Sequence, residues 1–343
     1  METRQITTDT LSARLLTEEA VALVKSQFEQ HLSQALNLKR ISAPMIVLKG
    51  TGINDDLNGI ERPVKFPIKG MQERPAEVVH SLAKWKRLRL KEYQIEPGTG
   101  IITDMKALRP DEDFTPIHSI YVDQWDWEVA MPEERRELSY LKESVQKIYA
   151  AMVAVEKEVA EKYPEKFQVL PEEITFIHSE ELLQKYPHLT PKQREDKAAK
   201  EFGAVFLMGI GGELSHGEPH DGRAPDYDDW SSPCAEGHCG LNGDIIVWNE
   251  VLGQAFELSS MGIRVDAETL DRQLIIRDQQ ERAELYYHQQ LLGGQLPQSI
   301  GGGIGQSRLC MFLLKKRHIG EVQVSIWPEE VRESCEQEGI HLL

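Results

Sequence analysis

Apolar residues recur every three or four positions in two long stretches of the chain, and this spacing predicts amphipathic helices. The first runs from Thr17 to Leu36 and the second from Ser139 to Tyr163. Shorter helices are expected over residues 77–93, 267–276 and 279–292. The first of these shorter helices is basic, and we expect a solvated face for most of its charged residues: Lys84, Lys86, Arg87, Arg89 and Lys91.

Apolar runs of strand length fill most of the remaining pattern. Four of them read as strands, with a pair of short helices between the first two: 174–179, 204–211, 243–251 and 255–265. A strand over 39–50 is interrupted by Pro44, which cannot donate to a ladder, so it belongs at an edge or a subunit boundary. Residues 301–308, GGGIGQSR, read as a glycine turn that feeds a helix, and 322–327 as a last strand. Irregular spacing between the strands favours a mixed or mainly antiparallel α+β fold over a doubly wound sheet.

The stretch 108–128, LRPDEDFTPIHSIYVDQWDWE, combines an arginine, an acidic loop and a polar strand. Strand side chains alternate between faces, so Gln124, Asp126 and Glu128 share one face. Burying them without partners would be costly. The stretch is therefore either an exposed strand with a polar outer face or part of a site.

Composition narrows the class of protein. The 343 residues include 39 Lys and Arg against 56 Asp and Glu, so the formal net charge is −17. Such a chain repels polyanions, which argues against nucleic-acid or acidic-membrane binding but leaves room for a local basic pocket for one nucleotide. No apolar run reaches the ~18 residues of a transmembrane helix, and the N-terminus lacks the core of a signal peptide. We expect a cytoplasmic protein.

The cysteine pattern offers a minor alternative. The chain has four cysteines and no disulfide framework, which is typical of a reducing compartment. Cys234, His238 and Cys239 lie close together, with His216 and His220 upstream. The paired ligand spacing of a structural zinc site is missing, so zinc is not favoured.

The common nucleotide-binding and hydrolase motifs are absent. In GGGIGQSR, glycines would let the backbone approach a ligand closely, and a helix starting there would offer N–H groups to an anion. Arg308 falls on the first turn of that helix. The alternative is a tight turn with close packing.

Carboxylates occur at the ends of neighbouring predicted strands. By simple alternation, Glu257 and Ser259 share one face of their strand, Arg264 has the opposite parity, and Asp244 opens the next strand. Mg²⁺ takes one or two protein carboxylates plus phosphate oxygens, so this is a candidate magnesium site. Capping and salt bridging are the alternative, and the same ambiguity holds for three aspartates of the preceding loop: Asp226, Asp228 and Asp229.

Three segments together resemble the motifs of class II aminoacyl-tRNA synthetases. The helix ending near Leu36, with the strand that carries Pro44, is similar to the first motif, a dimer interface. The stretch 108–128 resembles the second motif, and GGGIGQSRL the third, with Arg308 in the place of the nucleotide-stacking arginine. The resemblance implies six to eight mainly antiparallel strands flanked by helices, and a homodimer.

A closer resemblance, from about residue 18 to the C-terminus, is to the ammonia-dependent asparagine synthetases of the bacterial A type. It is carried by long strings: EVVHSLAKWKR, MKALRPDED, VDQWDWE, RAPDYDDW, LNGDIIVW, FELSSMGIRVD and IGGGIGQSRL. It implies one catalytic domain over 18–343 after an extension over 1–17, with no room for an anticodon-binding domain. Cys234 and Cys239 look peculiar to this chain, which further weakens the zinc alternative.

This resemblance implies an ATP-dependent ligase that joins L-aspartate and ammonia through a β-aspartyl adenylate, giving asparagine, AMP and diphosphate. Arg109 would hold the α-phosphate, and Arg308 and Gly303 would contact the rest of the nucleotide. Carboxylates would bind Mg²⁺: Glu257, Asp244 and, as a weaker candidate, Asp228.

The amino acid needs an anion for its ammonium group and a cation for its α-carboxylate. Asp126 and Gln124 are expected at the ammonium end, and Lys86 at the carboxylate. Asp55 would hold or deprotonate incoming ammonium, whose pKa lies far above neutrality. Two further hydroxyls would hydrogen-bond the substrate: Ser259 and Ser260.

Two other functions stay open at this point. A synthetase-like paralogue that loads an amino acid onto RNA or protein is disfavoured by the net charge of −17 and the missing anticodon-binding domain. A non-catalytic sensor of an amino acid or nucleotide is disfavoured by the presence of Arg109, Glu257 and Arg308, because a sensor need not keep a clamp for a transition state.

Overall fold

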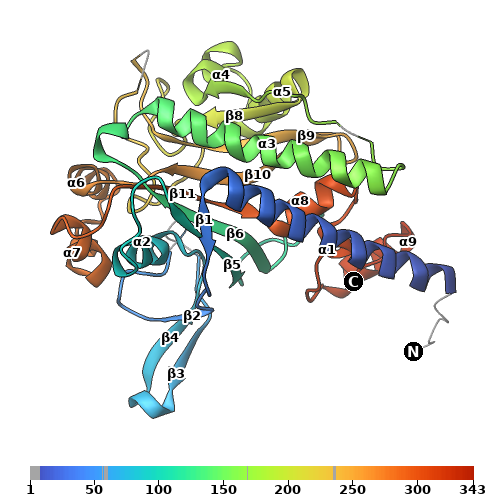
Figure 1. Ribbon diagram of the computed structural model, residues 1–343, viewed down its shortest axis with the longest axis horizontal. Helices are drawn as coiled ribbons and strands as arrows, with labels where there is room; N and C mark the ends of the chain where they lie inside the picture. Colours follow the sequence, from blue (N-terminus) through green and yellow to red (C-terminus); the bar gives the residue numbers. More distant parts are fainter. Residues whose placement is uncertain (1–7, 56, 58–60, 168, 235–236) are drawn as a thin grey trace.

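The computed structural model describes residues 8–55, 57, 61–167, 169–234 and 237–343. A large eight-stranded sheet forms the centre of the molecule (Figure 1). Its strands are, in spatial order, β1 (Leu38–Arg40), β5 (Gly100–Leu108), β6 (Tyr121–Ala130), β11 (Ser299–Gly305), β10 (Gln254–Ile263), β9 (Asn242–Asn249), β8 (Ala204–Met208) and β7 (Thr175–His178). The outer pairs β1–β5 and β7–β8 are parallel, and the five pairs between them are antiparallel. The expectation of a mainly antiparallel α+β sheet is confirmed.

A small sheet projects from the body as an arm (Figure 1). It contains β2 (Ile46–Leu48), β4 (Arg74–Val78) and β3 (Lys65–Ile68), with β4 in the middle. The expected strand over 39–50 is thus two short strands, β1 and β2, on either side of Pro44. Each lies at the edge of a different sheet. The edge position is confirmed, whereas the prediction of one continuous strand was wrong.

Helices cover both faces of the large sheet. Their bounds are α1 (Thr8–Leu36), α2 (Ala83–Glu92), α3 (Leu138–Lys162), α4 (Ser179–Lys185), α5 (Pro191–Phe202), α6 (Ala267–Ile276), α7 (Tyr286–Leu292), α8 (Gln306–Leu313) and α9 (Glu329–Gln337). The two longest, α1 and α3, lie side by side across one face (Figure 1). Helix α1 begins at Thr8 rather than Thr17, so it runs unbroken past the expected end of the N-terminal extension. No described helix has the length and apolarity needed to span a bilayer.

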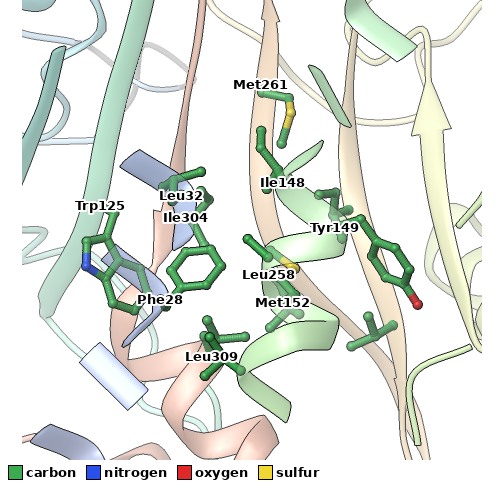
Figure 2. Close-up of a cluster of buried hydrophobic side chains, with 14 of the residues drawn as sticks. Phe28, Leu32, Trp125, Ile148, Tyr149, Met152, Leu258, Met261, Ile304 and Leu309 are labelled. Carbon is green, nitrogen blue, oxygen red and sulfur yellow. The ribbon is translucent and has the colours of Figure 1, made fainter. Parts of the chain in front are cut away.

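The face of the large sheet under α1 and α3 is the hydrophobic core (Figure 2). Phe28 of α1 packs on Trp125 of β6, with ring centroids 4.6 Å apart. Trp125 and Trp127 are buried in this core, and because strand side chains alternate, Gln124, Asp126 and Glu128 face the other side of the sheet. That opposite face, covered in part by α2, carries the candidate site.

Two glycine-rich or apolar segments differ from their predictions. The segment GGGIG is part of β11, a central strand between β6 and β10, and not a turn. Glycine has a low intrinsic preference for strands, but the side chains of both neighbours fill the space over it. Residues 322–327 form no strand in the described structure, and Val324 and Ile326 are each 70% exposed.

Helix α2 is shorter and more buried than expected. Residues 77 and 78 belong to β4, and the helix begins only at Ala83. The prediction that its basic residues face solvent is wrong for three of them, because Lys84, Lys86 and Arg87 are 2%, 0% and 0% exposed. Lysine and arginine are rarely buried unless they are paired, so these three indicate buried partners.

Candidate active site

A row of residues crosses four adjacent strands on the polar face. Asp126 of β6 pairs with Gly303 of β11, which pairs with Ser260 of β10, which pairs with Asp244 of β9. Directly paired residues have side chains on the same face of a sheet. Four expected site residues that are distant in sequence therefore lie in one line.

Glycines in β11 make room for this polar face. A Cβ at Gly303 would overlap the side-chain amide of Gln124. A Cβ at Gly301 would overlap the carboxylate of Glu128 and lie 2.6 Å from Arg264 Nη2. The bare backbone of β11 thus provides the space in which side chains from β6 and β10 meet.

A bulge in β10 sets which of its side chains face the site. The pairing of β10 with β9 shifts between Glu257 and Ser259. Leu258 and Met261, three residues apart, both lie in the hydrophobic core (Figure 2). The extra residue reverses the alternation, so Glu257 and Arg264 face the site together. The parity expected for Arg264 was therefore wrong.

A pocket of about 240 Å³ opens beside this row. It brings together six of the predicted site residues: Arg109, Gln124, Glu257, Ser259, Gly303 and Arg308. The other six predicted residues do not line the pocket. Lys86, Asp126 and Asp228 belong to a buried network, and Asp244 and Ser260 lie beside Arg223. Asp55 lies on the loop after β2.

Arg109 and Arg308 bring positive charge to the pocket. Arg109 Nη2 donates to the backbone oxygen of His80 at 3.3 Å, while its buried Nε has no acceptor among the described residues. Arg308 Nη1 donates to the backbone oxygen of Glu257 at 3.0 Å, and its guanidinium lies over the Phe256 ring. Planar guanidinium groups suit phosphate oxygens and aromatic faces, so both arginines are placed to bind a nucleotide.

His118 is a pocket residue that the sequence did not point out. Burial, and then the positive charge of Arg308, lower the pKa of His118 to about 4. The ring is therefore neutral near pH 7, and its Nε2 accepts a hydrogen bond from Arg308 Nη2 at 2.8 Å. Nδ1 then carries the proton and donates to Thr115 Oγ1 at 2.8 Å. His118 fixes the orientation of Arg308, and its only sequence signal was its position in the loop after Arg109.

The N-terminus of α8 is less open to an anion than expected. The Ser307 N–H donates to Asp123 Oδ1 at 2.9 Å, and Asp123 Oδ2 accepts from Lys25 Nζ at 2.9 Å. A protein carboxylate therefore already satisfies this helix-terminal donor. The prediction that backbone N–H groups of this helix terminus bind an anion is therefore wrong for Ser307.

A fully buried ionic network lies under the row. Arg264 binds Glu128 through two nitrogens, with Nη2 2.8 Å from Oε2, and also binds Asp228. Lys86 Nζ binds Asp126 and lies 3.7 Å from Glu128 Oε2. Burial alone would raise the pKa of Glu128, but Arg264 and Lys86 outweigh it and hold that pKa below its usual value.

The ion pairs of this network include more carboxylates than cations. Lys86 and Arg264 face three carboxylates, those of Asp126, Glu128 and Asp228. In addition, Asp126 Oδ2 is buried and has no hydrogen-bond partner in the described part of the chain. An unpaired carboxylate oxygen in a buried place is costly, so this position favours a cationic ligand.

Two carboxylates fit a magnesium ion. Asp244 is buried and ion-paired with Arg223, and Glu257 acts on it electrostatically. Burial is the largest influence on Asp244 and raises its pKa to about 7; the charge of Arg223 opposes this rise, and the charge of Glu257 adds to it. Both carboxylates are hard oxygen donors, and Mg²⁺ needs only one or two of them beside phosphate and water.

The remaining metal candidates are engaged elsewhere. Asp228 is ion-paired with Arg264. His178 stacks on His238, with ring centroids 4.3 Å apart, and its Nε2 donates to the backbone oxygen of Cys239. Over the described ranges, no three His, Cys, Asp or Glu side chains are grouped as metal ligands.

Asp55 lies beside the pocket through His80. His80 Nδ1 donates to the backbone oxygen of Asp55 at 3.1 Å, and the backbone oxygen of His80 accepts from Arg109. Asp55 is 3% exposed, and burial raises the pKa of its carboxyl to about 6. A buried carboxyl with that pKa can exchange a proton near neutral pH.

The architecture is that of class II aminoacyl-tRNA synthetases. Asparaginyl-tRNA synthetase of Pyrococcus horikoshii, solved with asparaginyl-adenylate, superposes with a TM-score of 0.68 over 94% of this chain and 74% of its own, at 15% identity. The enzyme of Entamoeba histolytica, also with asparaginyl-adenylate, gives a TM-score of 0.65 over 91% of this chain and 66% of its own, at 14% identity. At these identities the likeness shows the fold.

Sequence similarity identifies the branch. The family model described as aspartate-ammonia ligase matches residues 15–339. The curated aspartate–ammonia ligase of Parabacteroides distasonis is 60% identical over 327 residues, and that of Clostridium perfringens is 56% identical, each alignment covering 95% of both chains. The chain belongs to the aspartate–ammonia ligase family, which confirms the closer of the two resemblances.

The buried network should not tolerate a side chain on β11. We expect Gly301→Ala to lower the free energy of unfolding by about 3 kcal/mol or more, because the methyl group would separate the Glu128–Arg264 pair, whose side chains are both buried. Urea denaturation measures this. Gly70→Ala, whose added Cβ would meet nothing within 4 Å, is the matched control and should stay close to wild type. Equal stability of the two variants would contradict this reading of β11.

Proposed function

We propose that this protein forms L-asparagine from L-aspartate and ammonia, with ATP converted to AMP and diphosphate through a β-aspartyl adenylate. Membership of the aspartate–ammonia ligase family makes it a ligase and supports these substrates. The observation that carries the adenylate route is the placement of the arginine-lined pocket next to the buried Asp126 oxygen that lacks a partner. One position suits a nucleotide and the other an ammonium group.

In the first half-reaction the β-carboxylate of aspartate attacks the α-phosphorus of ATP, and diphosphate leaves. Arg109 is proposed to bind the α-phosphate, since its Nε lacks an acceptor among the described residues. Arg308 is proposed to lie against the adenine or the outer phosphates, held by His118 and Glu257. Gly303 is proposed to contact the nucleotide from the wall of the pocket, beside Gln124.

Magnesium would be held by Glu257 and Asp244. Bound there, it would draw charge towards the departing diphosphate. Asp228 is proposed for the amino-acid side of the site instead, because Arg264 holds it in the buried network.

The Lys86–Asp126 pair suggests how the amino acid binds. A bound amino acid would replace this ion pair by two new ones. Its ammonium group would bind Asp126, and its α-carboxylate would bind Lys86. Burial lowers the pKa of Lys86 despite the two nearby carboxylates, so an additional anion at Lys86 would relieve a desolvated cation. Neighbouring polar groups would complete the contacts: Gln124, Ser259 and Ser260.

In the second half-reaction ammonia attacks the β-carbonyl carbon, and AMP leaves. Ammonium itself has no free electron pair and must first lose a proton. Asp55 is proposed as the acceptor, because it is buried beside the pocket and its pKa of about 6 lets it be ionised at neutral pH.

We further propose that residues 18–343 form one catalytic domain that acts in the cytoplasm without nucleic acid. The net charge of −17 supports the absence of nucleic acid, because nucleic-acid binding requires clustered cations.

The reaction is tested by supplying aspartate, ATP, Mg²⁺ and ammonium, without tRNA or glutamine. We expect asparagine, AMP and diphosphate in equal amounts. Arg109→Ala should lower kcat by about 10²–10³-fold, the usual cost of removing a donor to transition-state charge. Arg135→Ala, which removes an arginine in a surface ion pair with Glu143, should leave kcat unchanged. ADP and phosphate as products would rule out the adenylate route, and wild-type activity of Arg109→Ala would remove Arg109 from the site.

The magnesium ligands are tested by metal titration. Glu257→Gln should raise the Mg²⁺ concentration needed for half-maximal rate by about tenfold or more, the scale of loss on removing groups that hold a metal. Glu250→Gln, on the exposed end of the neighbouring strand, is the control. An unchanged titration curve in Glu257→Gln would exclude this carboxylate as a ligand.

A homodimer is proposed from the exposed apolar residues that follow Pro44. Ile46 is the first residue of β2, the edge strand of the arm, and Met45 precedes it; they are 45% and 55% exposed. Light scattering should give twice the chain mass, and Met45→Glu should shift the equilibrium towards the monomer. Ile276→Glu changes an equally exposed residue of α6 and should not do so. A monomeric wild-type protein at micromolar concentration would contradict the proposal.

A further inference from the structure

A second buried ionic cluster lies next to Asp55. A single oxygen of Asp226, Oδ2, accepts from Lys84 Nζ at 2.8 Å, His288 Nε2 at 2.9 Å and Arg282 Nη1 at 3.2 Å. The side chains of Lys84, Asp226 and His288 are almost completely buried. Nothing in the half-reactions above uses this cluster, although a buried charge cluster is expensive to maintain.

The loop that carries Asp55 packs directly on this cluster. Gly52 has φ +71°, and a Cβ there would lie 2.9 Å from His288 Nδ1 and 2.9 Å from Leu285 Cβ. The Tyr287 N–H donates to the backbone oxygen of Thr51 at 3.1 Å. The loop therefore touches the cluster at Gly52, three residues before Asp55, and two members of the cluster, Lys84 and Asp226, act electrostatically on the Asp55 carboxyl.

We propose that Asp226 is a positioning residue for the ammonia step: it keeps the Lys84 ammonium in the cluster with His288 and Arg282, and thereby leaves the Asp55 carboxylate able to accept a proton from ammonium. The proposal rests on the function proposed above for Asp55. It assigns the cluster to the nitrogen donor, whereas the Lys86–Asp126 network serves the amino acid.

The proton balance requires such an acceptor. Ammonium loses one proton to Asp55, and the freed electron pair forms the C–N bond to the β-carbonyl carbon. The C–O bond to AMP breaks, and its electron pair leaves on the phosphate. The nitrogen loses its second proton after the attack, to the departing phosphate or to water, and Asp55 returns its proton to solvent.

The charges around Asp55 show why Lys84 has to be compensated. Burial is the largest influence and raises the pKa of Asp55; the cation of Lys84 lowers it, the negative charge of Asp226 raises it, and Arg109 lowers it. Without Asp226, its negative charge would no longer oppose the effect of Lys84, so the Asp55 carboxylate would be more stable and a weaker base. Among the described residues, the charged groups that act directly on Asp55 are Lys84, Arg109 and Asp226. His80 donates to the backbone oxygen of Asp55, Tyr227 interacts with its carboxyl electrostatically, and Arg282 and His288 bind Asp226.

The test is the acid limb of the pH profile of kcat/KM for ammonium. A base loses activity below its pKa, so the limb follows the pKa of Asp55. Asp226→Asn removes a negative charge and should move the limb to lower pH by about one unit, whereas Lys84→Met removes a cation and should move it to higher pH by about one unit. The double variant Lys84→Met/Asp226→Asn should return towards wild type. The proposal would be overturned if the acid limb does not move in either single variant, or if it moves in the same direction in both.

Two further measurements separate positioning from general damage. Exchange of labelled diphosphate into ATP, dependent on aspartate, reports the adenylate step alone and should persist in both single variants. Hydroxylamine is already neutral at neutral pH and needs no base, so with this nucleophile the acid limbs of both variants should coincide with wild type. Asp271→Asn, on the exposed side of α6, is the control and should change neither measurement.

The outcomes also distinguish this inference from the proposed function. If Asp55→Asn lowers kcat/KM for ammonium while both Asp226→Asn and Lys84→Met leave the limb unmoved, only this inference fails. If Asp55→Asn is as active as wild type, the role of Asp55 and this inference fail together. Should Asp226→Asn not fold, as judged by circular dichroism, Lys84→Met decides: a limb at higher pH supports the proposal and an unmoved limb overturns it.

Discussion

The absence of side chains on one face of β11 is the constraint on which the rest of the site depends. Gly301 and Gly303 leave room in the middle of an eight-stranded sheet for Gln124, Glu128 and Arg264 to lie across the strand. A core of ordinary side chains would exclude these polar groups, and a half-satisfied polar core would be unstable. The opposite face of the same strands is a closely packed hydrophobic core against α1 and α3, which fixes the polar face in position (Figure 2).

Most of the fold was predictable because long elements repeat their apolar residues regularly. Helix α3 and strands β9 and β10 begin and end within about two residues of the expected positions, the usual limit of boundary assignment. The strand character of β11 could not be predicted, because glycine gives no periodic signal and the strand exists only through its neighbours. The same holds for the bulge at Glu257, which reverses the face of Arg264 without any sequence mark.

The sequence predicted many of the residues that line the site, but few of the contacts that hold them. Arg109, Glu257 and Arg308 line one pocket because they lie on or beside three central strands of one sheet, β5, β10 and β11. Two partners of predicted site residues were missed: His118, which binds Arg308, and Arg223, which binds Asp244. Their roles follow only from contacts made in the folded chain. Burial of the basic residues of α2 was missed for the same reason: Lys84 and Lys86 bind carboxylates, and Arg87 binds backbone oxygens, that are distant in sequence.

Helix α2 links the two halves of the proposed chemistry. At 3.6 residues per turn, side chains two positions apart point about 200° apart around a helix. Lys86 therefore reaches Asp126 in the sheet, while Lys84 reaches Asp226 in the loop outside it. One rigid element thus positions a cation in each buried cluster, at a separation fixed by helix geometry. An acidic chain can in this way place one buried lysine beside Asp126 and another beside Asp226, and the two clusters keep their charges apart because the helix holds the lysines on different sides.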